Sequence, residues 1–215
     1  MEKDVITLNQ KAWNRLADRY AYSGYGEITP TFKYFYTRLT PNCRILDIGS
    51  GTGIPFAKFL VEKGFRILGI DISSRMVQIA SRNVPSGEFR ELSMTEMTFK
   101  EEFGGVVASY SMLLLNPPLF HDVAKRIVYS LQEGGILYLS LNESSENDEH
   151  SDLEAIVTIM GEKMYSRGYT ELEVRNAFIP LGFRVLKIKR SIRTTPEFGV
   201  ENMMEVVFEK NYSNM

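Results

Sequence analysis

Apolar and polar residues follow two different periods along this chain. Near the N-terminus, Trp13, Leu16, Ala17 and Tyr20 fall at i, i+3, i+4 and i+7, which predicts an amphipathic helix within a helical segment over residues 1–40. Beyond residue 44, short apolar runs alternate with segments of helical period. The runs predict strands at 45–48, 66–70, 88–91, 105–109, 136–141, 183–190 and 203–209. This alternation predicts an α/β fold with a mostly parallel sheet covered by helices on both faces.

Capping residues mark where several of the helices begin and end. Ser73 and Ser74 are good N-caps for a helix whose apolar stripe includes Met76, and Thr170 with Glu173 makes a capping box for another. The prediction is one domain over 1–215, with 1–40 as a helical N-terminal cap. Residues 142–154 are acidic and rich in Ser and Asn, which favours a solvated loop, although a lid insertion over 142–170 is the functional alternative.

Composition and charge exclude several classes of function. The net charge is −2, so a nucleic-acid substrate is disfavoured and a small-molecule partner is favoured. Cys43 is the single cysteine and there are two histidines, which leaves no disulfide and no usual zinc site, so no metal is expected. The sequence has no apolar run long enough for a membrane span and its first residues do not resemble a signal peptide, which indicates a cytoplasmic protein.

The clearest chemical signal is a glycine-rich turn between the first strand and the next helix. It reads Asp47-Ile48-Gly49-Ser50-Gly51-Thr52-Gly53. Glycines there allow positive φ and let the backbone approach a ligand, while the helix N-terminus presents free N–H groups to an anion. A dinucleotide fingerprint needs its third glycine at position 54, which is Ile54, so the spacing argues against a nicotinamide-dependent oxidoreductase.

With this motif, the chain resembles the class I S-adenosylmethionine-dependent methyltransferases from about Trp13 to Phe208. The resemblance implies a Rossmann-like, doubly wound, seven-stranded sheet whose last strand is antiparallel. It implies that S-adenosyl-L-methionine binds at the carboxyl ends of the strands and leaves as S-adenosyl-L-homocysteine. Asp47 would hold the ammonium group and Asp71, which ends the second strand, would hold the ribose hydroxyls. The remaining residues predicted to bind the cofactor are Tyr20, Gly49, Ser50, Gly51, Gly53, Ile72, Met76, Ser93, Met94, Ser109 and Tyr110.

Some of these assignments depart from the family pattern or have a structural alternative. Ser93 stands where the family often has an acidic residue before the adenine, and a surface serine is the other interpretation. Tyr20 fits the cap that closes over the methionine end of the cofactor, but core packing explains it nearly as well. Tyr165 and Arg167 are weaker candidates for binding substrate.

Two further patterns are interpreted as structural. Asn116-Pro117-Pro118 resembles the Asn-Pro-Pro motif of amino-methylating enzymes, but it lies seven residues after the strand end at Ser109, so the prolines are expected to start a helix. His121 could act as a base but fits a surface position at that helix start. The acceptor atom, the general base and the oligomeric state stay open, and a non-catalytic cofactor-binding module is the alternative function.

Overall fold

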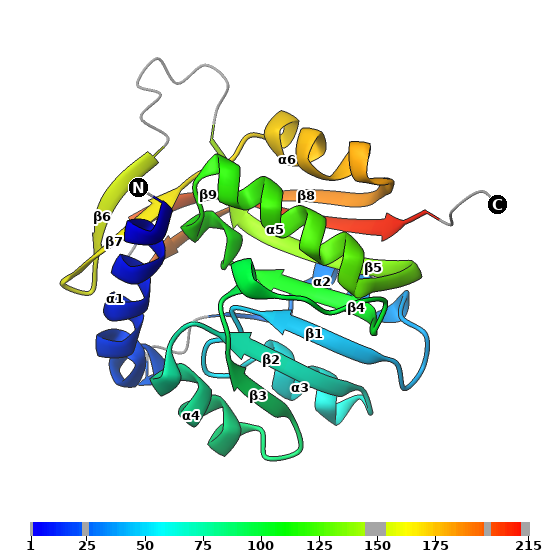
Figure 1. Cartoon of the computed structure of the whole chain (residues 1–215), viewed down its shortest axis with the longest axis horizontal. Helices are drawn as coiled ribbons and strands as arrows, with labels where there is room; N and C mark the ends of the chain where they lie inside the picture. The colour runs from blue at the N-terminus through cyan, green and yellow to red at the C-terminus, as the bar shows by residue number, and fades with distance from the viewer. Residues whose placement is uncertain (1, 23–25, 145–153, 196–198, 212–215) are drawn as a thin grey trace.

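The structure is a computed structural model that describes residues 2–22, 26–144, 154–195 and 199–211. A seven-stranded sheet has the order β3-β2-β1-β4-β5-β9-β8 (Figure 1). Its strands are β1 (Arg44–Ile48), β2 (Arg66–Asp71), β3 (Glu88–Glu91), β4 (Phe103–Ser109), β5 (Leu131–Asn142), β8 (Phe183–Thr195) and β9 (Gly199–Lys210). Strands β1 to β5 run parallel to one another, and β9 is antiparallel to both β5 and β8. The predicted mostly parallel sheet with an antiparallel last strand is confirmed.

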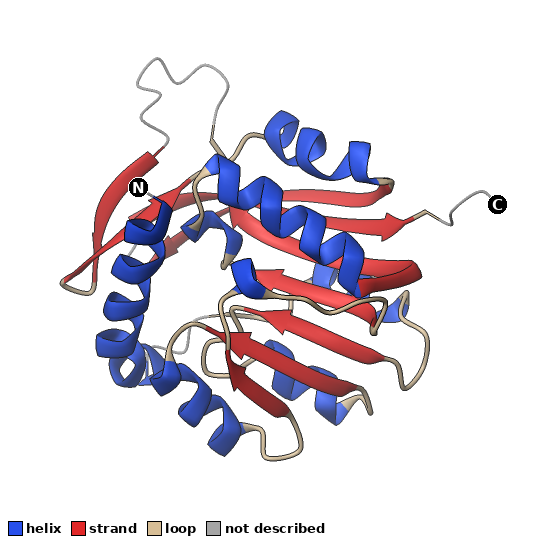
Figure 2. Ribbon diagram, viewed as in Figure 1, coloured by secondary structure: helices blue, strands red, loops and turns tan. Residues whose placement is uncertain are grey.

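Helices cover both faces of this sheet (Figure 2). The helices are α1 (Glu2–Tyr22), α2 (Pro30–Thr37), α3 (Phe56–Glu62), α4 (Ser74–Asn83), α5 (Pro117–Ser130) and α6 (Glu171–Phe178). Phe120 of α5 and Phe178 of α6 belong to one apolar core, whereas Phe32 of α2 and Leu60 of α3 belong to the core on the opposite face. Both cores consist of side chains with almost no exposure, which is the main source of the fold's stability.

Local sequence explains where several helices start. The Ser73 hydroxyl accepts from Met76 N at the start of α4, and the Thr170 capping box is present at the start of α6. The Asn116 side chain accepts from Leu119 N and Pro117 opens α5, so the interpretation of Asn116-Pro117-Pro118 as a helix start is confirmed.

A β-hairpin follows the acidic stretch over 142–154, which was expected to be a solvated loop. Strands β6 (Glu154–Ile159) and β7 (Glu162–Arg167) pair as a separate two-stranded sheet, and residues 145–153 lie outside the described residues. Met160 and Gly161 both have positive φ at the turn. Val157, Ile159 and Met164 pack with Leu16 of α1, so the hairpin lies against the N-terminal helix (Figure 1). The solvated loop predicted for residues 142–154 therefore stays a prediction, and no element was predicted for residues 154–167, where the hairpin packs against α1.

Candidate functional site

The glycine-rich turn lies at the carboxyl end of β1 and is held by hydrogen bonds to the neighbouring strand. Gly49 N and Ser50 N both donate to the Ile70 carbonyl, at 2.8 and 3.0 Å, and Gly51 N donates to Asp71 Oδ2 at 2.9 Å. Gly49 and Gly51 have φ of 70° and 52°, a region that glycine enters at little cost. The strand end, the turn and Asp71 therefore form one rigid unit.

Gly49 and Gly51 lack a side chain for different structural reasons. A Cβ at Gly49 would lie 2.4 Å from Cβ of Ser111, so a side chain there would collide with the loop after β4. A Cβ at Gly51 would meet nothing within 4 Å, although this residue lines the large pocket over the strand ends. Gly49 thus serves packing, whereas Gly51 leaves open a surface that a ligand can approach.

Two buried carboxylates lie beside this turn. Asp47 is 3% exposed and Asp71 is 9% exposed. Burial, reinforced by the charge of Asp71, raises the pKa of Asp47 to about 7. Burial also raises the pKa of Asp71 to about 6, against the effect of N–H bonds from Ser73 and Gly51. A bound cation would therefore stabilise the ionised forms of both carboxylates.

The remaining polar groups of the turn fit a zwitterionic nucleoside. Each Asp71 oxygen already accepts one backbone N–H, from Gly51 and from Ser73 at 2.8 Å, and retains lone pairs for hydroxyl donors such as those of a ribose. The Ser50 hydroxyl is buried with no hydrogen-bond partner among the described residues. The open face of Gly51, the carboxylate pair and the free hydroxyl fit S-adenosylmethionine, which carries an ammonium, a carboxylate and a ribose.

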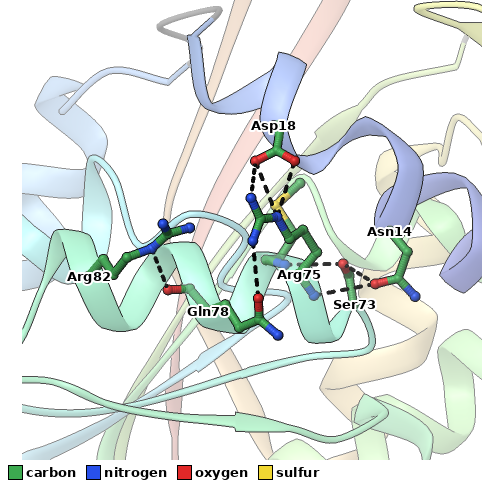
Figure 3. Close-up of polar contacts among 7 residues, drawn as sticks. Asn14, Asp18, Ser73, Arg75, Gln78 and Arg82 are labelled. Atoms are coloured by element: carbon green, nitrogen blue, oxygen red, sulfur yellow. Dashed lines mark hydrogen bonds and ion pairs between the residues drawn. The ribbon is translucent and has the colours of Figure 1, made fainter.

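Helix α1 forms a wall of the pocket and is fastened to α4 beside Asp71 (Figure 3). Asn14 Oδ1 accepts from Ser73 Oγ at 2.8 Å and from Arg75 N at 3.3 Å. One turn further along α1, the Asp18 carboxylate pairs with the Arg75 guanidinium at 2.7 Å. Exposed ion pairs contribute little, so the part-buried hydrogen bond between Asn14 and Ser73 is the stronger tie.

Most predicted cofactor residues line this one pocket. They are Tyr20, Asp47, Gly49, Ser50, Gly51, Asp71, Ile72, Met76, Ser93, Met94, Ser109 and Tyr110. Tyr20 contacts Trp13 edge-to-face with ring centroids 5.3 Å apart, so it lines the pocket and packs within the cap. Ser93 caps a short 3-10 helix by accepting from Thr95 N, and Met94 is buried beside it. The cofactor roles of these residues stay predictions.

Four other residues singled out in the sequence lie away from the pocket wall. A Cβ on Gly53 would be 3.1 to 3.4 Å from Val84, Phe89 and Ala80, so this glycine serves packing. Tyr165 is buried on β7, where its backbone pairs with Asn9. Arg167 pairs with Glu173 at 2.8 Å and lies over the Tyr169 ring. His121 is on the exposed side of α5. The geometry gives Gly53 and Arg167 structural explanations.

The pocket continues past the turn toward residues that sequence patterns did not identify. Asn142, Arg193 and Glu201 line it from the outer ends of β5, β8 and β9. Trp13 and Asn9 line it from α1. These residues come from distant parts of the chain and belong to no motif. The sequence carries a signal only for the helical ones, through the spacing of Trp13 with Leu16.

The described part of the chain carries neither a metal-ligand cluster nor a membrane-spanning helix. Its His, Cys, Asp and Glu side chains form no group of three able to hold a metal ion. No helix within the same residues has the length and apolar character needed to cross a bilayer.

Comparisons with known proteins agree with this geometry. Residues 45–135 match the methyltransferase domain family. A carboxy-S-adenosyl-L-methionine synthase of Desulfotalea psychrophila is 29% identical over 145 residues, which cover 63% of this chain and 58% of that protein. A putative methyltransferase of Bacillus subtilis, YqeM, is 38% identical over 118 residues, covering 52% of this chain and 47% of the relative. The chain spans about three fifths of the length of the first curated relatives it matches.

Solved structures share the fold at low identity. The 1,6-didemethyltoxoflavin-N1-methyltransferase of Burkholderia thailandensis, solved with its substrate and S-adenosylhomocysteine, superposes with a TM-score of 0.76 at 16% identity, covering 99% of this chain and 91% of that one. A SAM-dependent methyltransferase of Methanosarcina mazei gives 0.74 at 18% identity, covering 87% of this chain and 100% of the other. The likeness over nearly the full length shows the Rossmann-like methyltransferase fold.

Proposed function

We propose that this chain, which carries a class I S-adenosylmethionine-dependent methyltransferase domain, binds S-adenosyl-L-methionine and transfers its methyl group to a small-molecule acceptor. The observation that carries the proposal is the glycine turn with Asp47 and Asp71 beside it. A pair of buried carboxylates with raised pKa values next to the open face of Gly51 suits a ligand with an ammonium group at one end and a ribose behind it.

Each part of the cofactor has a complementary wall in the pocket. Asp47 would hold the ammonium group, and the open face of Gly51 would let the methionine part of the cofactor approach the turn. Asp71 would accept from the ribose hydroxyls. Met94 and Ile72 would offer apolar surface for the adenine ring, and Tyr20 would close the methionine end from α1, since all three line the pocket. Gly53 contributes to the packing of the turn rather than to this set.

The cofactor supplies a methyl group already activated by the sulfonium charge. The protein therefore has to place the acceptor atom in line with the methyl–sulfur bond and keep water out. Ser109 and Tyr110, at the end of β4, lie at the junction between the glycine turn and the outer part of the pocket. This position suits residues that separate the cofactor from the acceptor.

A small acceptor suits the shape and charge of the site. The outer pocket is walled by α1 and by the ends of β8 and β9, and the net charge of −2 gives no general attraction to a phosphate backbone. The Burkholderia structure holds a small molecule, 1,6-didemethyltoxoflavin, beside S-adenosylhomocysteine. We treat residues 1–215 as one domain with α1 as its cap, and we expect a cytoplasmic location.

Turnover separates an enzyme from a module that only senses the cofactor. The purified protein is incubated with S-adenosylmethionine carrying a trideuterated methyl group and a library of hydroxyl, amine and thiol compounds, and products are detected by mass spectrometry. We expect a product heavier by the labelled methyl, absent with Gly51→Arg. Calorimetric binding of the cofactor without any labelled product would favour the sensing module. Formation of carboxy-S-adenosyl-L-methionine, with no methylated acceptor, would favour the activity named for the Desulfotalea relative.

A further inference from the structure

Buried polar atoms without a hydrogen-bond partner lie around the pocket over the strand ends. Among the described residues, four such atoms belong to side chains that line this pocket: Ser50 Oγ, Ser111 Oγ, Trp13 Nε1 and Asn142 Oδ1. Buried groups of this kind are rare in folded proteins, because each has lost its bonds to water and gained none. Several of them around one cavity indicate that a ligand completes the hydrogen bonding there.

Two of the four atoms lie at the glycine turn, in the half of the pocket proposed for the cofactor. Ser50 is part of the turn, and Ser111 Oγ lies 3.2 Å from the position that a Cβ on Gly49 would take. Trp13 and Asn142 lie outside the turn, on α1 and at the end of β5. Their open atoms are therefore available to a second ligand in the outer pocket.

The two asparagines of the outer pocket differ in what they leave unbonded. Asn9 is 2% exposed, its Nδ2 donates to the Leu114 carbonyl at 3.0 Å, and its Oδ1 accepts from Tyr165 N at 2.8 Å. Asn142 Nδ2 donates to Glu201 Oε1 at 3.0 Å, which fixes the amide orientation because a carboxylate accepts hydrogen bonds. Asn142 Oδ1 is left without a donor among the described residues. Asn9 thus serves the fold, whereas Asn142 offers an acceptor to a ligand.

Hydrogen bonds hold Asn142 in a fixed position relative to α1. Tyr169 N donates to the Asn142 carbonyl at 3.0 Å, and Tyr169 Oη donates to the Leu115 carbonyl at 2.7 Å. The adjoining Leu114 carbonyl is the one that accepts from Asn9 of α1. A ligand that binds an atom already held in place has less ordering to do, so this position suits selective recognition.

Trp13 supplies a donor on the same wall of the pocket. It lies one turn after Asn9 on α1, and together with Leu114 and Ile159 it packs around the buried Met164 of the hairpin. Trp13, Leu114 and Ile159 all line the pocket. An indole donates one N–H and accepts nothing, so the open Trp13 Nε1 calls for a lone pair on a ligand oxygen or nitrogen.

The other walls of the outer pocket favour an uncharged ring. Ile6, Leu114 and Ile159 provide aliphatic surface. Arg193 and Glu201 carry opposite charges and are opposite each other in the β8–β9 register. A charged ligand gains no net attraction from such a pair, whereas a ring can pack against the indole and the aliphatic side chains.

We propose that the methyl acceptor is an uncharged ring compound that donates an N–H or O–H to Asn142 Oδ1 and accepts from Trp13 Nε1 through a carbonyl oxygen or ring nitrogen. This inference rests on the proposed methyltransferase function, in which the cofactor fills the other half of the pocket. Asn142 and Trp13 select the acceptor, and Glu201 acts through Asn142 as a positioning residue. Cyclic amides and hydroxylated heteroaromatic rings carry this combination of groups.

The chain has one tryptophan, so the contact with Trp13 can be observed directly. A proton–nitrogen correlation spectrum of the labelled protein, saturated with S-adenosylhomocysteine, should show a single indole N–H peak that is absent from Trp13→Phe. The probe is 2-pyridone, a neutral ring with an N–H beside a carbonyl, and 1-methyl-2-pyridone is the matched probe with that N–H capped. We expect 2-pyridone to shift the indole peak downfield until saturation and to bind about tenfold more tightly than the capped probe.

Two substitutions assign the two hydrogen bonds. Asn142→Leu removes the open oxygen, so 2-pyridone should then bind no more tightly than 1-methyl-2-pyridone. Asn202→Leu is the matched control, since it makes the same change at an exposed position of β9 on the opposite face from Glu201, and it should keep the tenfold preference. Trp13→Phe keeps an aromatic ring without the N–H, so by ligand-observed NMR both probes should bind about fivefold more weakly.

Equal affinity of the wild type for the two pyridones, an indole peak that neither probe moves, or an N–H preference that persists in Asn142→Leu would overturn the inference. The comparison of the two probes on wild type decides the matter even if Asn142→Leu does not fold. Calorimetric binding of S-adenosylhomocysteine tests the proposed function separately. A wild type that binds S-adenosylhomocysteine but does not discriminate between the pyridones contradicts this inference alone, whereas one that binds no S-adenosylhomocysteine contradicts the proposed function as well.

Discussion

The substitution Asp47→Asn should stabilise the free protein while weakening cofactor binding. Asp47 is completely buried beside Asp71, and these surroundings raise its pKa to about 7 from an ordinary value of 3.8. Such a rise corresponds to about 4 kcal/mol of unfavourable free energy when the group is ionised. Asparagine has nearly the same shape and carries no charge. We expect a net gain of about 2 kcal/mol at pH 8, because the new amide must still find partners.

The sign of the pH dependence follows from the raised pKa. Folded Asp47 holds its proton up to about pH 7, whereas unfolded Asp47 loses it near 3.8. The folded state therefore binds more protons between these values, and the free energy of unfolding falls as the pH rises through them. Asp71, with a pKa of about 6, adds to the same trend. Wild type should lose about 4 kcal/mol between pH 5 and pH 8, and Asp47→Asn distinctly less.

Urea unfolding of both proteins at pH 5 and pH 8 measures these differences, and calorimetry measures the affinity for S-adenosylhomocysteine. The affinity of Asp47→Asn should fall by about 30-fold or more, since it loses a charge-assisted bond to the ammonium group. Asp122→Asn, a half-exposed change on α5, should alter neither quantity by much. A less stable Asp47→Asn protein at pH 8, or an unchanged affinity, would refute the reasoning.

Four further substitutions separate binding from folding. Gly51→Ala should cost about 1 kcal/mol of stability through its positive φ and at least tenfold in calorimetric affinity for S-adenosylhomocysteine, whereas Gly49→Ala should unfold at much lower urea because its Cβ collides with the loop after β4. Asn116→Ala should cost about 1 kcal/mol in urea unfolding and leave cofactor affinity unchanged; a large loss of affinity would revive the Asn-Pro-Pro interpretation. Asn14→Ala should lower cofactor affinity about threefold and speed proteolysis of α1; unchanged values would mean that its bond to α4 does not hold the cap.

Local chemistry explains why much of the fold could be predicted from the sequence. The signals for the turn from Gly49 to Gly51 lie within a few residues: an apolar strand before it, glycines that allow positive φ, and a helix after it. Asp71 could be identified by its place at the end of the second strand. Helix starts at Ser73 and Thr170 could be identified because capping requires a particular side chain at one position.

The parts that could not be predicted depend on contacts between distant segments. The β6–β7 hairpin is stabilised by packing of Met164 and Val157 against α1. This contact joins distant segments, so no local pattern predicts it. The long ends of β8 and β9 reach the pocket with charged residues, Arg193 and Glu201, that strand periodicity does not distinguish from a solvated surface. The hydrogen bond from Tyr138 to Glu205 joins β5 to β9, whose register no local pattern specifies.

Isothermal titration of the wild-type protein with S-adenosylhomocysteine, repeated on Gly51→Arg and Asp71→Ala, tests the central claim most directly. We predict micromolar binding at one site per chain in wild type and no measurable binding in Gly51→Arg, whose side chain would fill the open face of the turn. Asp71→Ala should also bind far more weakly, because it loses the acceptor that also holds Gly51 N. No binding by wild type, or equal binding by all three proteins, would contradict the assignment of this pocket to the cofactor.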